Sequence, residues 1–274
     1  MWGFGVVVQL TVTWCPMSLA GVVLAAGPSA RMGIPKALLD FRGQSFVTRI
    51  VDALAALDVK PRFVVLGPDA PRVRPLLATT PDCYIVENPD VAGGPIASLR
   101  CALAALRPVR PEALLAWPVD LPHVRIATVE RLLETYRHAH PPAVVPAFGG
   151  RRGHPVIWDE ALFAELETSA AATRHGARAV LKAHEDHLAI VAVDDPAVLD
   201  DVNTPADYER LIRELNRDII LKRRTSAVAS SRGVKDRPPV WLTIPNKMLR
   251  IRKMTPTTPP QLSVRKRLRG EEQA

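Results

Sequence analysis

Cysteine is scarce in this chain, and its placement argues against a disulfide-based fold. There are 3 cysteines among 274 residues, an odd number, and no two of them form a C-x-x-C pair. This usage is untypical of a disulfide framework and indicates a reducing compartment, so we expect a cytoplasmic protein. Cys83 and Cys101 lie within apolar patterns, which favours places in the core over roles as nucleophiles.

Long apolar runs are absent as well. No stretch approaches the roughly 20 apolar residues that a helix needs to cross a bilayer, so the sequence predicts no membrane partner. The first 17 residues are apolar but lack the basic start of a secretory signal. We therefore interpret residues 1–17 as an N-terminal extension, with Met17 as an alternative start.

Acidic residues are scarce only toward the carboxyl terminus. The net charge is +8, yet residues 217–274 hold 15 Lys and Arg against 4 Asp and Glu, whereas residues 1–216 hold 21 against 24. The segment 217–274 is rich in Pro, Ser, Thr and basic residues, so we expect a disordered basic tail. Residues 18–216 are predicted to form the folded domain. Nucleic-acid binding stays open for the tail alone, although Trp241 is its one aromatic residue.

Apolar runs alternate with helical patterns along residues 18–216. Each run is continuous and bounded by turn residues, which is typical of strands covered on both faces. The alternation predicts an α/β fold, a Rossmann-like three-layer sandwich with a mostly parallel central sheet and ligands beyond the carboxyl ends of its strands. The predicted strands are 20–25, 62–66, 83–86, 113–117, 143–147 and 188–193. The predicted helices lie near 44–58, 71–78, 95–106, 124–139, 176–184 and 205–215.

The first predicted strand runs into a glycine loop, Leu24–Lys36, that carries two cations. Gly27 permits a sharp turn, and exposed N–H groups together with Arg31 and Lys36 suit a polyphosphate. The spacing matches neither common phosphate loop, because the P-loop requires G-x-x-x-x-G-K and the dinucleotide fingerprint requires G-x-G-x-x-G. A plain turn with two incidental cations is the alternative.

The same segment, L-A-A-G-P-S-A-R-M-G-I-P-K, resembles the signature of the nucleotidyltransferases similar to molybdenum cofactor cytidylyltransferase and guanylyltransferase. The wider group includes sugar-1-phosphate nucleotidyltransferases, and the resemblance extends over residues 19–215. It implies a fold of the nucleotide-diphospho-sugar transferase type. It also implies that Arg31 and Lys36 bind the triphosphate and act in catalysis. The residues that would hold the nucleobase and ribose are Leu24, Ala25, Ala26 and Gly27.

Two later segments resemble the metal-binding motifs of that family. Asp120 follows the strand at 113–117 in the context D-L-P, and Asn203 lies in D-V-N-T-P-A-D. The resemblance implies that Asp120 and Asn203 hold Mg²⁺, with Asp120 also catalytic, and carboxylate and amide oxygens suit this ion. Many relatives carry Asp where this chain has Asn203. The alternative is that Asp120, and Asn203 or Thr204, merely cap the helices that follow.

Two further loops resemble the substrate-binding segments of the family. The segment E-N-P-D-V-A-G-G-P-I-A-S-L makes Asn88 and Ser98 candidates for contact with the base or ribose, unless they form only a turn and a helix cap. The segment G-R-R-G-H-P makes Arg151, Arg152 and His154 candidates for binding an anionic acceptor such as a phosphate monoester. Relatives often carry a Gly-Asp pair where this chain has T-R-H before G-A-R, so its acceptor side departs from the typical pattern.

Together these residues predict a Mg²⁺-dependent nucleotidyltransferase. It would move a nucleoside monophosphate from a nucleoside triphosphate to a phosphate-bearing acceptor and release pyrophosphate. By resemblance, the L-A-A-G motif favours CTP, and molybdopterin is one candidate acceptor, which would place the enzyme in molybdenum cofactor biosynthesis. Two alternatives remain open: a sugar-1-phosphate nucleotidyltransferase, and a nucleotide-binding module whose basic tail binds nucleic acid.

Overall fold

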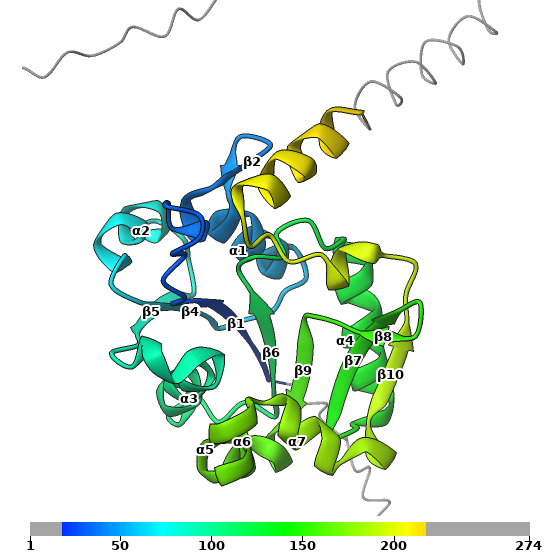
Figure 1. The fold of residues 1–274 in the computed structure, drawn as a ribbon. Helices are drawn as coiled ribbons and strands as arrows, with labels where there is room; N and C mark the ends of the chain where they lie inside the picture. Colours follow the sequence, from blue (N-terminus) through cyan, green and yellow to red (C-terminus); the bar gives the residue numbers. More distant parts are fainter. Residues whose placement is uncertain (1–17, 218–274) are drawn as a thin grey trace, which may run out of the picture. The chain divides into compact units, whose positions relative to one another are not determined.

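The central sheet in the computed structural model confirms the predicted α/β fold (Figure 1). The structure describes residues 18–217, and the interpretations of residues 1–17 and of the tail beyond residue 217 lie outside this range. Eight strands in the described part follow the order β10–β7–β9–β6–β1–β4–β5, with β8 paired to β7. The six predicted strands are β1 (Leu19–Ala25), β4 (Arg62–Leu66), β5 (Cys83–Glu87), β6 (Ala113–Pro118), β7 (Ala143–Phe148) and β10 (Ala189–Ala192).

Most of the strands run parallel, as predicted. β1 is parallel to β4 and β6, β4 to β5, and β7 to β10. An unpredicted strand, β9 (Val156–Asp159), lies between β6 and β7 and is antiparallel to both. The short strand β8 (Arg151–Arg152) is antiparallel to β7, and β2 (Asp40–Phe41) and β3 (Gln44–Ser45) form a separate hairpin.

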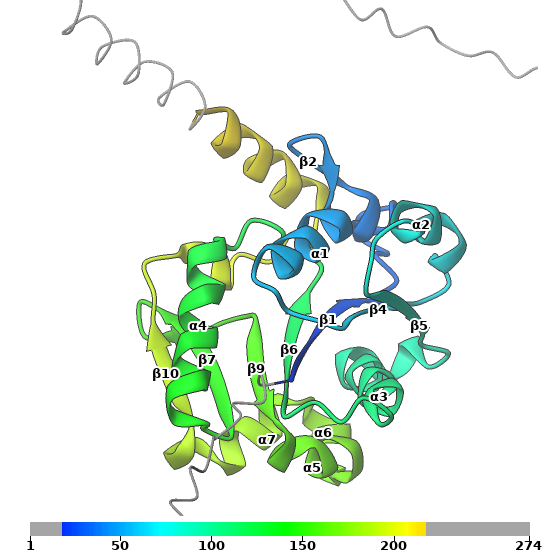
Figure 2. The ribbon, with the colours of Figure 1, turned by 180° about the vertical axis from the view of Figure 1, so that it is seen from behind.

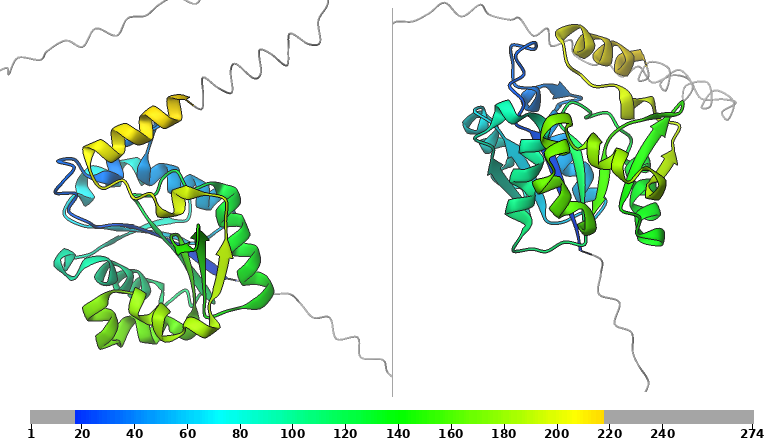
Figure 3. Two further views of the ribbon diagram at one scale, coloured as in Figure 1. Left: turned by 45° about the vertical axis from the view of Figure 1, so that its right-hand side comes forward. Right: turned by 60° about the horizontal axis from the view of Figure 1, so that its bottom comes forward.

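The helices form two layers, one on each face of the sheet (Figures 2 and 3). Successive residues of β1 show this alternation, because Val23 packs in one core cluster with Ile50 and Val22 packs in the other with Leu99. One layer holds α1 (Phe46–Ala56), α2 (Ala70–Leu77), α4 (Ile126–Ala139) and a last helix over residues 205–217. The other holds α3 (Gly94–Leu106), α5 (Phe163–Thr168), α6 (Ala170–His175) and α7 (Arg178–Ala183).

The carboxyl ends of β1, β4, β5 and β6 meet at one edge of the sheet, since these strands are parallel neighbours. Short 3₁₀ helices occupy the connecting segments, among them η1 (Lys36–Leu38), η2 (Val91–Gly93) and η5 (Pro196–Leu199). Gly67, the residue after β4, packs tightly against the segment after β1. A Cβ atom added at Gly67 would lie 2.5 Å from the Ala26 carbonyl oxygen. Within residues 18–217 no helix is both long and apolar enough to cross a membrane.

Candidate active site

The loop after β1 is folded by the side chain and backbone of Ser29. The Ser29 carbonyl oxygen accepts hydrogen bonds from the N–H groups of Met32 and Gly33 at 2.8 and 3.2 Å. Its hydroxyl accepts from the Lys36 N–H at 3.0 Å, just where η1 begins. Gly33 has φ +68°, a left-handed conformation that favours glycine. The loop is therefore an ordered turn that fixes the backbone of Lys36, and Ser29 is a structural residue that the motif alone did not single out.

Lys36 joins the two residues predicted to bind metal. Its Nζ donates to Asp120 Oδ2 at 3.0 Å and to Asn203 Oδ1 at 2.7 Å. Asp120 follows β6, and Asn203 precedes the last helix. The backbone also ties these two segments, because the Val202 N–H donates to the Asp120 carbonyl oxygen at 3.0 Å. Three side chains that are far apart in the sequence thus converge on one point.

The amino end of the last helix is capped by residues other than Asn203. Thr204 Oγ1 accepts from the Asp207 N–H, and Asp207 Oδ2 accepts from the N–H groups of Asn203 and Thr204. This is the reciprocal arrangement of a capping box. The hydrogen bonds from Thr204, chiefly that of its hydroxyl, lower the pKa of Asp207. Capping therefore falls to Thr204 and Asp207, and the amide oxygen of Asn203 remains directed at Lys36.

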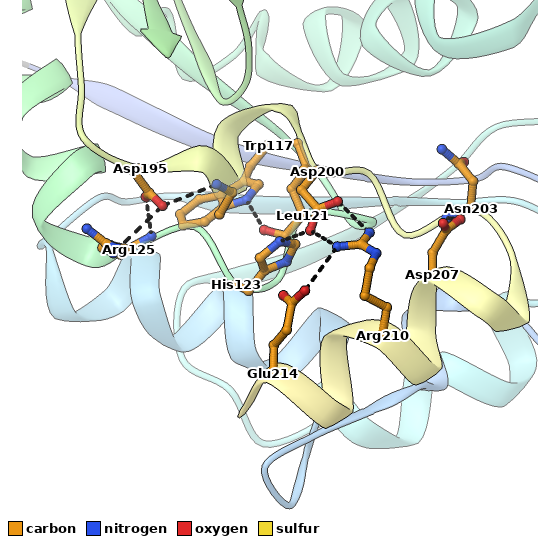
Figure 4. A network of polar contacts seen from close by, with 11 residues as sticks. Trp117, Leu121, His123, Arg125, Asp195, Asp200, Asn203, Asp207, Arg210 and Glu214 are labelled. Atoms are coloured by element: carbon orange, nitrogen blue, oxygen red, sulfur yellow. Dashed lines mark hydrogen bonds and ion pairs between the residues drawn. The ribbon is translucent and has the colours of Figure 1, made fainter. Parts of the chain in front are cut away.

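Asp200, three residues before Asn203, is bonded to side chains of two other segments (Figure 4). Arg210 donates to both of its carboxylate oxygens at 2.9 and 2.6 Å, and His123 Nε2 lies 3.2 Å from Oδ2. The hydrogen bonds from His123 and then Arg210 hold the pKa of Asp200 well below its usual range. We call these three residues the Asp200 clamp. It joins the loop after β6, the segment before Asn203 and the last helix.

His154 reaches the site through a tight backbone contact. Its N–H donates to the Val198 carbonyl oxygen at 2.9 Å. At Gly153 an added Cβ would lie 2.2 Å from the same oxygen, so this position excludes any side chain. Burial lowers the pKa of His154, while the charge of Asp120 acts in the opposite direction. Burial thus favours the neutral form of the His154 imidazole, which lines the same cavity as Asp120.

A cavity of about 520 Å³ lies at the carboxyl edge of β1 and β6, and it is lined by Lys36, Asp120, His154 and Asn203 among others. Of the predicted base and triphosphate residues, Leu24, Ala26, Gly27, Arg31, Lys36 and Ser98 line it. Ala25 lies outside it, against a smaller hollow toward Gly67. Asn88 is buried behind the wall, where its Nδ2 donates to Ser98 Oγ at 3.0 Å. Asn88 thus holds Ser98 in place without reaching the cavity.

Only one of the three residues predicted to bind the acceptor lines the cavity. His154 lines the cavity, but Arg151 and Arg152 do not. Both arginines are exposed on β8, and Arg152 forms an ion pair with Glu185. The cavity lining also includes apolar side chains for which the sequence predicted no role: Ile96, Leu99, Ala116, Trp158 and Ala177.

Asp201 is a second acidic residue that lines the cavity, and the sequence analysis did not predict it as a site residue. Burial, and after it the negative charge of Asp120, raise its pKa. The only signal for it was the doubled D-D before V-N-T-P. Within residues 18–217 no three His, Cys, Asp or Glu side chains are grouped to hold a metal ion. The oxygens of Asp120 and Asn203 nevertheless converge on one cation, the Lys36 ammonium, and such hard donors suit Mg²⁺ when water and phosphate complete its shell.

This fold and this convergence of a glycine loop, a lysine and two oxygen side chains define a nucleotidyltransferase. The chain belongs to the MobA-like NTP transferase domain family, whose model matches residues 21–188. Membership confirms the resemblance to the molybdenum cofactor transferases. Solved relatives also confirm the nucleotide-diphospho-sugar transferase type of fold.

Several known proteins are similar over most of the described residues. The crystal structure of Rv0371c from Mycobacterium tuberculosis is 31% identical, covers 72% of this chain and 98% of its own, and has a TM-score of 0.60. The same protein is known in complex with manganese, at 30% identity and a TM-score of 0.57. The molybdenum cofactor guanylyltransferase of Rhodobacter capsulatus is 29% identical over 195 residues, 71% of this chain and 95% of that protein.

Two other relatives carry different names. The nicotine blue oxidoreductase of Paenarthrobacter nicotinovorans is 29% identical over 205 residues, 71% of this chain and 96% of that protein. The bifunctional protein GlmU of Bifidobacterium animalis is 32% identical over 130 residues, which is 46% of this chain. This chain spans only 28% of the length of that GlmU, so the similarity concerns one part of a larger protein.

Proposed function

We propose that this enzyme transfers a nucleoside monophosphate from a nucleoside triphosphate to a phosphate-bearing acceptor and releases pyrophosphate. The observation that best supports this proposal is the contact of Lys36 Nζ with both Asp120 and Asn203, in a cavity that is also lined by the loop after β1. A polyphosphate lying along that loop meets backbone N–H groups and the cations Arg31 and Lys36.

The chemistry is an in-line displacement at the α-phosphorus. An acceptor phosphate oxygen forms a bond to that phosphorus, the bond to the bridging oxygen of the β-phosphate breaks, and pyrophosphate leaves. The protein contributes by positioning the reactants and neutralising charge, so no protein nucleophile is required. Lys36 and Arg31 would offset the charge that develops on the leaving pyrophosphate. The imidazole of His154, which lines the cavity together with Asp120, would orient the acceptor phosphate.

Asp120 and Asn203 are the residues that would hold Mg²⁺. One carboxylate and one amide oxygen give a weak site by themselves, which nucleotide phosphates and water would complete. A bound divalent ion supplies Lewis-acid stabilisation of the phosphoryl oxygens. The manganese complex of Rv0371c supports a divalent ion in this family, and Mg²⁺ is our proposal for this chain.

For the nucleotide, we propose CTP first and GTP as its direct competitor. The L-A-A-G motif favours CTP, whereas the Rhodobacter relative is named a guanylyltransferase. For the acceptor, molybdopterin is our first candidate, because the chain belongs to the family of the MobA-like transferases and is similar to a molybdenum cofactor guanylyltransferase. We thus rank molybdopterin above the sugar 1-phosphates.

Two assays test this function. A thermal-shift panel with CTP, GTP, UTP, ATP and dTTP, each with Mg²⁺, should raise the unfolding temperature for at least one nucleotide, because ligands well above Kd stabilise by mass action. Pyrophosphate release should then appear with molybdopterin and stay near background with sugar 1-phosphates. A silent nucleotide panel would refute nucleotide binding. Oxidoreductase activity without pyrophosphate release would make the oxidoreductase relative the better guide to function.

The binding-module alternative is separable by truncation. Deleting residues 218–274 removes the basic tail and leaves the described residues intact. Unchanged pyrophosphate release with loss of RNA binding would assign the two activities to different parts of the chain. RNA binding without any pyrophosphate release in the full chain would favour the binding module.

A further inference from the structure

The ammonium of Lys36 lies where a metal ion would lie. It donates to Asp120 Oδ2 at 3.0 Å and to Asn203 Oδ1 at 2.7 Å, the two oxygens that would hold Mg²⁺. The Lys36 side chain is 14% exposed and that of Asp120 is 23% exposed. A lysine ammonium is a compact, strongly hydrated charge, and in so little solvent it depends on these two oxygens as its partners.

The ammonium and a metal ion cannot share this position. Mg²⁺ lies about 2.0–2.1 Å from its oxygen ligands, inside the space that Nζ fills between the two side chains. The two charges have the same sign, and within a cavity wall they are poorly screened. A metal ion that takes both oxygens must therefore displace the lysine side chain.

We propose that Lys36 and the metal ion alternate on Asp120 and Asn203, and that the metal enters together with the nucleoside triphosphate. The backbone of Lys36 is held by Ser29, whereas its four-carbon side chain has several rotatable bonds through which the ammonium can move once its two partners are taken. A triphosphate on the β1 loop offers the displaced ammonium a new anionic partner. Metal alone offers none, so free metal binds weakly. The nucleotide part of this inference rests on the proposed function, whereas the competition between lysine and metal does not.

The decisive experiment measures binding of Mn²⁺ alone, by electron paramagnetic resonance of the unbound ion, to the full-length protein and its Lys36→Met variant. Met keeps the length of the side chain without its charge. We expect Lys36→Met to bind Mn²⁺ roughly tenfold or more tightly than the wild type, within the usual range for coupling between two ligands. The same variant should bind the Mg²⁺–nucleotide complex more weakly, so the two affinities move in opposite directions.

Arg31→Met is the matched control. Arg31 lines the same cavity and carries the same charge, but the described structure shows it in no hydrogen bond with Asp120 or Asn203. Its loss should weaken nucleotide binding and leave Mn²⁺ binding within about twofold of the wild type, since only a general change in potential remains. An equal gain of Mn²⁺ affinity in Lys36→Met and Arg31→Met would overturn the proposal, because the loss of a nearby positive charge would then explain the gain without competition for the two oxygens.

Two further variants complete the test. Asp120→Asn in the Lys36→Met background should abolish the gained Mn²⁺ affinity, and persistence of that gain would place the ion elsewhere and overturn the proposal. Lys36→Arg keeps a cation beside Asp120, so its Mn²⁺ affinity should stay as weak as in the wild type. Unchanged Mn²⁺ affinity in Lys36→Met also overturns the exchange, even if nucleotides bind. Absence of nucleotide binding with tightened Mn²⁺ would instead refute the proposed function and leave the exchange standing.

Discussion

The side of the cavity proposed to bind the triphosphate is built differently from the side proposed to bind the acceptor. On the proposed donor side, Lys36, Asp120 and Asn203 are joined by hydrogen bonds between three segments, and the Asp200 clamp ties one of these segments to its neighbours (Figure 4). On the proposed acceptor side, His154 lines the cavity, whereas Arg151 and Arg152 are exposed on β8 and do not line it. Binding and activating a triphosphate requires fixed charges, whereas an acceptor pocket can vary with its substrate while the fold stays the same.

The largest effect is expected where the donor contacts meet, at Asp120. Asp120→Asn removes the charge that serves both Lys36 and the proposed metal ion, so pyrophosphate release should fall about a thousandfold, the upper range for loss of one electrostatic contact. The unfolding temperature should change little, because the backbone bond from Val202 remains. Stopped assays of pyrophosphate with saturating nucleotide measure this. Near-normal turnover would remove Asp120 from the mechanism.

Lys36→Ala should have the next largest effect. Loss of one donor to a developing charge typically costs about 2.7–4 kcal/mol of activation free energy, so turnover should drop about a hundredfold or more with the fold intact. Circular dichroism checks the fold, and pyrophosphate release checks the rate. If Lys36→Ala releases pyrophosphate at close to the wild-type rate, its assignment to the donor side is wrong.

The Asp200 clamp should affect both stability and turnover. Asp200→Asn removes the charge that accepts the hydrogen bonds of Arg210, so the free energy of unfolding should fall by about 1.5 kcal/mol. The loosened Asn203 segment should reduce kcat about tenfold with a smaller change in KM for the nucleotide, as expected of a small misplacement. Denaturant unfolding and steady-state kinetics measure the two effects. A pure stability effect with unchanged kcat would limit the clamp to a structural role.

The clamp also predicts a pH dependence. Because the pKa of Asp200 is lower in the folded chain than in the unfolded one, the ionised carboxyl stabilises the folded state above the unfolded pKa of about 3.9. That contribution is lost as the pH falls toward the folded pKa. The difference in unfolding free energy between wild type and Asp200→Asn should therefore shrink from about pH 6 to about pH 3. If the difference in unfolding free energy grew as the pH fell from about 6 to about 3, the pKa of Asp200 would not be lowered in the folded chain.

The smallest effects are expected at the exposed arginines. An exposed ion pair such as Arg152–Glu185 contributes at most about 1 kcal/mol, so Arg152→Ala should leave the unfolding temperature nearly unchanged. If Arg151 and Arg152 attract an anionic acceptor, the double alanine variant should raise the acceptor KM a few-fold and leave the nucleotide KM alone. A raised nucleotide KM would move both arginines to the donor side and erase the contrast between the two sides.

The same contrast separates what the sequence could predict from what it could not. Strands such as β1 and β6 are continuous apolar runs and could be predicted from the sequence. Motifs singled out Lys36, Asp120 and Asn203, and the structure brings the three side chains together, while their roles stay predictions. The apolar run of β9 extends only from Val156 to Trp158 before Asp159, which is too short to indicate a strand, and Trp158 looks like any core residue in the sequence. Apolar cavity walls and apolar cores have the same composition. Only the three-dimensional arrangement distinguishes Trp158 and Leu99 as lining residues.

The most direct test of the central claim follows the phosphorus atoms of the substrate. CTP or GTP labelled at either the α- or the γ-phosphate is incubated with Mg²⁺, the full-length protein and the acceptor. Nucleotidyl transfer predicts that the α-label enters the acceptor product while the γ-label leaves in pyrophosphate. Transfer of the γ-label to the acceptor, or release of γ-label as inorganic phosphate with no α-label in the product, would contradict it.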